Sequence, residues 1–129
     1  MGNRKHKQNG RSKSEGQYLI LPYSLLHHPA WRRLSGSAKS VFLELRSRFN
    51  GSNNGQLRLS LGEGAKLLGM SKTTIDRKFD ELEEAGFIVK TKQGNWYGRK
   101  AHEWASTDIP CNGYPATRDW QNRWKEKPL

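Results

Sequence analysis

The sequence has little of several features that would define a secreted, membrane-bound or metal-binding protein. It contains a single cysteine, Cys111, among 129 residues, which excludes an intrachain disulfide framework and a zinc site built from cysteines. No apolar run approaches the ~18 residues that a membrane-spanning helix needs. No apolar segment of signal-peptide length follows the basic N-terminus, and there is no lipidation motif. We therefore expect a cytoplasmic protein without a membrane anchor.

Motifs of catalysis are missing as well. The chain has no Gly-rich phosphate loop, no Cys/His metal spacing and no G-x-S-x-G motif. His27 and His28 are adjacent, so on a helix they point in different directions, and no further ligands accompany them. We therefore expect no enzymatic activity, no cofactor and no metal.

Acidic residues are scarce relative to basic ones. The chain has 12 of them against 23 lysines and arginines, a formal net charge of +11. The excess lies in the first half: residues 1–16 hold five basic and one acidic residue, and residues 17–59 hold six and one. A small basic protein favours a polyanionic partner, nucleic acid before an anionic membrane.

Composition divides the chain into three segments. Residues 1–16 contain no apolar residue after Met1, so they cannot bury enough surface to offset the entropy of ordering. We interpret them as a flexible basic arm, either lying along DNA or serving as a solvated tail, and both interpretations stay open. Residues 17–105 form the expected domain, and residues 106–129 a C-terminal extension. The basic residues of the arm are Arg4, Lys5, Lys7, Arg11 and Lys13.

Several elements are expected ahead of the central motif. Trp31 and Leu34 are expected core anchors, and apolar residues at helical spacing follow them. Prolines and an Asn-Gly pair mark where the elements end. The predicted segments are a strand at 17–21, a helical turn at 24–28, a helix from Ser35 or Ser37 to Asn50-Gly51, and a short strand at 56–59.

Two helices joined by a tight turn follow. Ser60 is expected to cap a helix at 61–68 that closes at Gly69, and Ser71 to cap a helix at 72–85 that ends at Gly86. Ala65 is small and would let the two helices cross closely. This is a helix-turn-helix arrangement, in which the second helix enters the major groove of DNA by its N-terminal residues.

The charges along the second helix fit that docking. Its first turns carry threonine, lysine and arginine, which can bond base edges or phosphates, whereas its far end is acidic and cannot lie along phosphates. We expect it to contact DNA by its first two turns only. The candidate residues are Ser71, Lys72, Thr73, Thr74, Arg77 and Lys78.

The segment resembles the winged helix-turn-helix family. The resemblance rests on A65-x-x-L68-G69, on S71-x-T73-T74-I75-x-R77-x-F79-x-x-L82-E83-x-x-G86-F87-I88 and on a following hairpin, from 87–92 through a turn at 93–95. The leading Y18-L-I-L-P22 and A30-W31-x-x-L34-S35 look like the entry of small phage- and mobile-element-encoded winged-helix proteins, and the ending resembles N-terminal domains of phage-type replication proteins. Gly62 and Gly64 depart from the pattern, because each weakens a helix by about 1 kcal/mol relative to Ala.

The resemblance implies an α+β fold with a three-helix core, a small antiparallel sheet and a hairpin wing that touches the minor groove or the DNA backbone. Phosphate contacts of this kind position a protein without specifying sequence. The candidate wing residues are Lys90, Lys92, Gln93, Asn95, Arg99 and Lys100.

The leading hypothesis is a nucleoid-associated, sequence-specific double-stranded-DNA-binding protein that regulates transcription in a bacterial or mobile-element setting. A replication initiator or origin-binding factor would use the same fold. A protein-interaction module is the third hypothesis, with Trp120 and Trp124 on a short helix capped by Thr117 as the contact. Packing of these indoles back onto the domain is the more common outcome. A homodimer would suit palindromic sites, but no heptad pattern demonstrates one.

Overall fold

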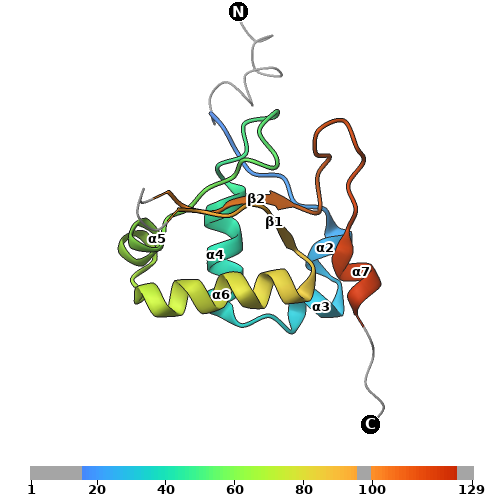
Figure 1. Cartoon of the computed structure of the whole chain (residues 1–129). Helices are drawn as coiled ribbons and strands as arrows, with labels where there is room; N and C mark the ends of the chain where they lie inside the picture. Colours follow the sequence, from blue (N-terminus) through green and yellow to red (C-terminus); the bar gives the residue numbers. More distant parts are fainter. Residues whose placement is uncertain (1–15, 96–99, 125–129) are drawn as a thin grey trace, which may run out of the picture.

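The computed structural model describes residues 16–95 and 100–124; residues 1–15, with all the basic residues of the arm, and Arg99 lie outside them. Short helices come first, then the main helices, a hairpin and a last short helix (Figure 1). These elements are α2 (Tyr23–Leu26), α3 (Pro29–Arg32), α4 (Gly36–Arg46), α5 (Leu61–Leu68), α6 (Lys72–Ala85), β1 (Ile88–Lys92), β2 (Glu103–Ser106) and α7 (Asp119–Arg123).

Three helices form the centre of the fold. α6 packs against α4 and α5, with α5 near its N-terminal end and α7 near its C-terminal end (Figure 1). The core contains an aromatic cluster among aliphatic side chains: Trp31, Phe42 and Phe87 contact one another edge to face, with ring centroids 5.4–6.1 Å apart. Trp31 and Leu34 are both buried, as predicted.

The hairpin follows α6 directly. β1 and β2 pair antiparallel, with Val89 opposite Ala105 and an irregularity between Lys90 and Lys92. On its other edge Trp104 exchanges two backbone hydrogen bonds with Leu57, at 2.9 and 3.0 Å. Helix, bridge, two helices and hairpin therefore follow in the order of a winged helix, and the predicted α+β fold class is confirmed.

The structure confirms the predicted helix ends at which a nearby serine or glycine caps the helix. The hydroxyls of Ser35, Ser60 and Ser71 each accept a hydrogen bond from the backbone amide three residues on. Gly69 and Gly86 end α5 and α6 in the left-handed conformation, with φ of +68° and +92°, which glycine adopts without steric cost.

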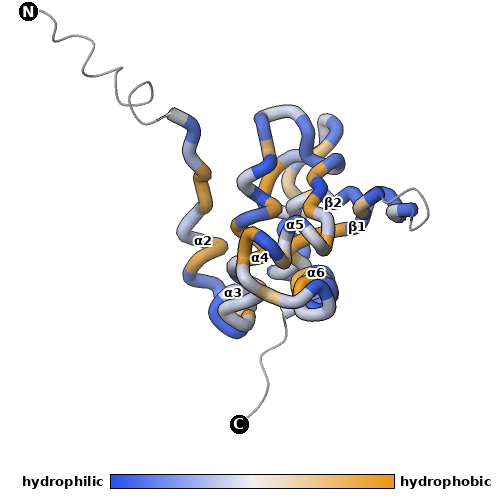
Figure 2. Tube along the Cα trace, turned by 90° about the vertical axis from the view of Figure 1, so that its left-hand side faces the viewer, coloured by the Kyte–Doolittle hydropathy of each residue, from blue (hydrophilic) through white to orange (hydrophobic). Residues whose placement is uncertain are grey.

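Three predictions of regular structure before α5 are wrong. The segment 17–21 is extended, and Figure 2 shows its apolar residues leading up to α2, but it is not a strand. The carbonyl of Ile20 accepts a hydrogen bond from Arg46 instead of pairing with a sheet. The helix expected to reach 50 ends at Arg46, because the Asn53 side chain bonds the backbone of Arg48 and Asn50. The strand at 56–59 is reduced to the Leu57 bridge.

The C-terminal segment returns to the core. Trp120 is fully buried and stacks on Phe87, with ring centroids 5.2 Å apart, so the expected packing of this indole onto the domain is confirmed. Trp124 is half-buried beside His28 and under the guanidinium of Arg33. Thr117 is not the cap of α7: the helix starts at Asp119 after Arg118, without a side-chain cap.

Within residues 16–95 and 100–124, no helix is both long and apolar enough to cross a membrane.

Candidate nucleic-acid interface

The six candidate residues of α6 and its cap do not share one environment. Lys72, Thr73 and Arg77 are exposed, and in the described part of the chain none of the three side chains forms a hydrogen bond or ion pair. Ser71 is exposed, but its hydroxyl caps the helix and also contacts the Thr74 hydroxyl at 2.9 Å. Lys72, Thr73 and Arg77 are therefore the predicted side chains of α6 that are most available to a ligand.

Lys78 lies on the side of α6 that faces α4. Its ammonium contacts the Glu81 carboxylate at 3.2 Å, and that carboxylate also accepts hydrogen bonds from the amide and hydroxyl of Ser35, at 2.8 and 2.9 Å. Burial raises the pKa of Glu81, but the Ser35 hydrogen bonds and the nearby Lys78 outweigh it and hold the pKa below its ordinary value. Glu81 therefore joins α6 to the start of α4, and Lys78 is paired with its carboxylate.

The close crossing of α5 and α6 occurs at Gly64. A Cβ at this position would lie 3.2 Å from Cγ2 of Ile75, tighter than most such contacts. The assignment of this crossing to Ala65 is therefore corrected, since Ala65 is only half-buried and Gly64 is buried. The glycine that weakens α5 in isolation is the residue that lets α6 approach it.

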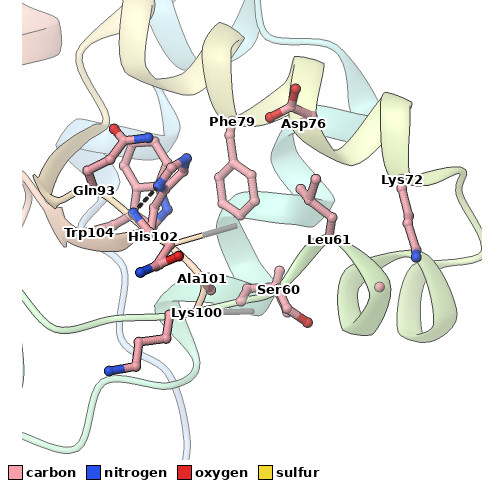
Figure 3. Close-up of a pocket in the computed structure, with 14 residues that line it drawn as sticks. Ser60, Leu61, Lys72, Asp76, Phe79, Gln93, Lys100, Ala101, His102 and Trp104 are labelled. Carbon is pink, nitrogen blue, oxygen red and sulfur yellow. Dashed lines mark hydrogen bonds between the residues drawn. The ribbon is translucent and has the colours of Figure 1, made fainter. Parts of the chain in front are cut away.

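An open cleft of about 1010 Å³ lies between the start of α5, the first half of α6 and the hairpin (Figure 3). Phe79 stacks on Trp104 with ring centroids 5.1 Å apart and gives the cleft an apolar wall. Its polar lining combines both charges: Lys72 and Asp76 come from α6, and Lys100 and His102 from the hairpin. Neither Asp76 nor His102 was predicted from the sequence as a site residue.

His102 fixes the hairpin turn next to this cleft. Its Nδ1 accepts a hydrogen bond from the Gly94 amide at 2.7 Å (Figure 3). Burial and the nearby Lys90 lower the pKa of His102, against smaller opposing effects of Asp76 and Glu83. A neutral imidazole is the form that can accept this bond. A Cβ at Gly94 would lie 2.3 Å from the Lys100 carbonyl oxygen, so the two backbone segments of the hairpin turn are in close contact.

The predicted wing residues divide into two groups. Lys90 is half-buried, and its ammonium lies 5.5 Å from the centroid of the Trp104 ring, which is a cation–π contact. Lys92, Gln93, Asn95 and Lys100 are exposed. These four line a second cleft of about 550 Å³, which adjoins the first at Gln93, Asn95 and Lys100.

Two arginines of this second cleft were missed by the sequence analysis. Arg58 is exposed and forms an ion pair of 2.7 Å with Glu103 of β2. Arg48 contacts Glu44 at 3.0 Å and Glu63 at 3.3 Å, which joins the end of α4 to the start of α5. Because both guanidiniums are already paired, this cleft carries less unpaired positive charge than its arginines suggest. The available signal for Arg58 was its polar position within the predicted strand at 56–59, between the apolar Leu57 and Leu59.

Three packed helices followed by a two-stranded antiparallel hairpin define a small α+β protein with a winged-helix layout. Comparisons with protein-family models, with curated proteins and with solved structures found no match to this chain.

Proposed function

We propose that the protein is a sequence-specific double-stranded-DNA-binding protein that regulates transcription. One observation carries the proposal: the first two turns of α6 present Thr73 and Arg77 to solvent beside a hairpin that presents Lys92 and Lys100. A helix of this kind fits the major groove, where an arginine can form two hydrogen bonds to guanine. The hairpin lysines would then contact phosphates of the flanking backbone.

The charges of α6 support one orientation on DNA. Its C-terminal half carries Asp80, Glu83 and Glu84, which phosphates would repel. Arg77 and Lys72 lie in the first two turns, at the end where the helix dipole is positive. The N-terminal end of α6 would therefore enter the groove, with the acidic end directed away from the duplex.

The test is a selection from random duplex DNA at about 150 mM salt, followed by sequencing of the retained fraction. We expect an enriched motif, and the affinity of the wild type for it to fall steeply as salt rises, since bound lysines and arginines release counterions. Retention without a motif would contradict specific recognition, and an affinity indifferent to salt would contradict DNA binding. A symmetric motif would indicate a dimer, and motifs clustered at a replication origin would favour the replication alternative.

The matched variant is Arg77→Ala, with Arg32→Ala, at an exposed position of α3, as the control. We expect Arg77→Ala to cost about 1–3 kcal/mol on the selected site and to relax preference at one base pair. Arg32 lies outside the residues that line either cleft at the hairpin, so its replacement should leave the motif unchanged. Unchanged affinity and preference in Arg77→Ala would contradict the role given to Arg77.

A further inference from the structure

Asp76 stands apart from the other acidic residues of α6. It is exposed, one turn after Lys72, and it is the one acidic side chain among the described residues that line the cleft between α6 and the hairpin (Figure 3). Glu81 is engaged by Ser35 and Lys78, and Asp80 and Glu84 lie further along the helix. Within residues 16–95 and 100–124, the Asp76 side chain takes part in no hydrogen bond or ion pair.

The chemistry of a carboxylate limits which groups of DNA the Asp76 side chain can contact. It repels phosphates, so it is unfavourable wherever the DNA backbone passes. An ionised carboxylate only accepts hydrogen bonds, so its partner must be a donor. In the major groove the donors are the amino groups of cytosine N4 and adenine N6, whereas guanine and thymine present acceptors there.

We propose that Asp76 is a specificity-determining residue that selects a base with an exocyclic amino group, cytosine in the first place. The inference rests on the proposed function, and it adds to it the chemistry of one base pair. Arg77, the next residue, is directed to a different side of the helix, since consecutive residues are about 100° apart. The two side chains would therefore contact different base pairs. Asp76 would accept a hydrogen bond from one base, and Arg77 would donate hydrogen bonds to another.

The replacement of Asp76 by asparagine changes the expected preference, because asparagine both donates and accepts and pairs with adenine through N6 and N7. We expect the wild type to prefer cytosine at one position by about five- to 150-fold, which corresponds to about 1–3 kcal/mol. In Asp76→Asn that preference should change to adenine. In Asp76→Ala it should be lost, while the remaining positions of the motif stay the same.

The experiment is the same selection with wild type, Asp76→Asn, Asp76→Ala and the matched control Asp80→Asn, which removes an equal charge one turn further along α6. Circular dichroism melting checks that each variant folds, as expected for exposed positions. A preference for adenine in the wild type that is lost in Asp76→Ala would also support an amino-group contact. Tighter binding to all sequences with an unchanged motif in Asp76→Ala would overturn the inference and leave the proposed function standing. A wild type without any motif would overturn both.

Discussion

The buried ion pair of Arg46 and Asp108 offers the sharpest test of the energetics of the fold. Nε and Nη2 of Arg46 contact the two carboxylate oxygens of Asp108 at 3.2–3.3 Å, and Nη2 also donates to the Ile20 carbonyl at 3.0 Å. The Ser106 hydroxyl donates to the same carboxylate. The side chains are 7% and 1% exposed. The pair therefore joins the end of α4, the extended segment before α2 and the segment after β2.

The perturbation is Asp108→Asn, which keeps the shape of the side chain and removes its charge. The Arg46 guanidinium then stays buried without its counterion, and removal of one partner of such a pair costs about 3–5 kcal/mol. That is a large part of the about 5–15 kcal/mol by which a domain is stable. Urea unfolding followed by tryptophan fluorescence gives the free energy of unfolding, with five tryptophans as probes.

A double-mutant cycle separates the pair from its surroundings. Arg46→Met combined with Asp108→Asn should cost less than the sum of the single changes, because no unpaired charge remains. The pair of Arg58 and Glu103 is the comparison: the Arg58 side chain is 63% exposed and that of Glu103 is 12% exposed, so only one of its two charges is buried, and Arg58→Met should cost less than Asp108→Asn. A loss in Asp108→Asn no larger than that of Arg58→Met would refute the reasoning, because water would then be replacing the counterion.

Two further predictions concern the end of α6 and the hairpin turn. Gly86→Ala places a Cβ 2.7 Å from the backbone of Trp120 at a φ of +92°. Urea unfolding should therefore show a clearly larger loss in the free energy of unfolding than for Gly69→Ala, where φ is +68° and no atom lies within 4 Å. Equal losses in the two variants would argue against the docking of α7. The pKa of His102 is lowered in the folded protein, so its contribution to stability is complete above the ordinary value near 6.5 and is lost as pH falls through the lowered pKa. NMR titration of the imidazole measures this, and a pKa above 6.5 would contradict it.

The sequence predicts α5 and α6 well because their ends depend on local chemistry. Ser60 and Ser71 satisfy amides within three residues, and Gly69 and Gly86 adopt a conformation that other residues avoid. Neither interaction needs a distant partner. The order of helices and hairpin then favours the winged-helix layout before any packing is known.

The segments before α5 could not be predicted in the same way, because distant contacts decide them. The apolar segment at 17–21, ended by Pro22, is typical of a short strand, but Arg46 engages the Ile20 carbonyl, and its partner Asp108 is 62 residues further along the chain. Asn53 stops the continuation of α4 through a loop contact with Arg48 that helical periodicity does not reveal. The burial of Trp120 likewise depends on Phe87 being close to it in space.

The candidate site shows the same division between local pattern and three-dimensional packing. The apolar stripe of α6 identifies its buried face, and consecutive residues step by about 100° around it. The stripe does not say which of the remaining sides meets the hairpin and which meets α4. The contacts decide this: Lys78 is paired beside Ser35, Asp76 shares a cleft with Lys100, and Arg77 is exposed. A basic residue in the first turns of such a helix is therefore a candidate for DNA contact only after its neighbours in space are known. By that criterion Arg77 remains a candidate for DNA contact, and Asp76 becomes a candidate for base recognition. Lys78 is better explained by its ion pair with Glu81, which contacts the start of α4.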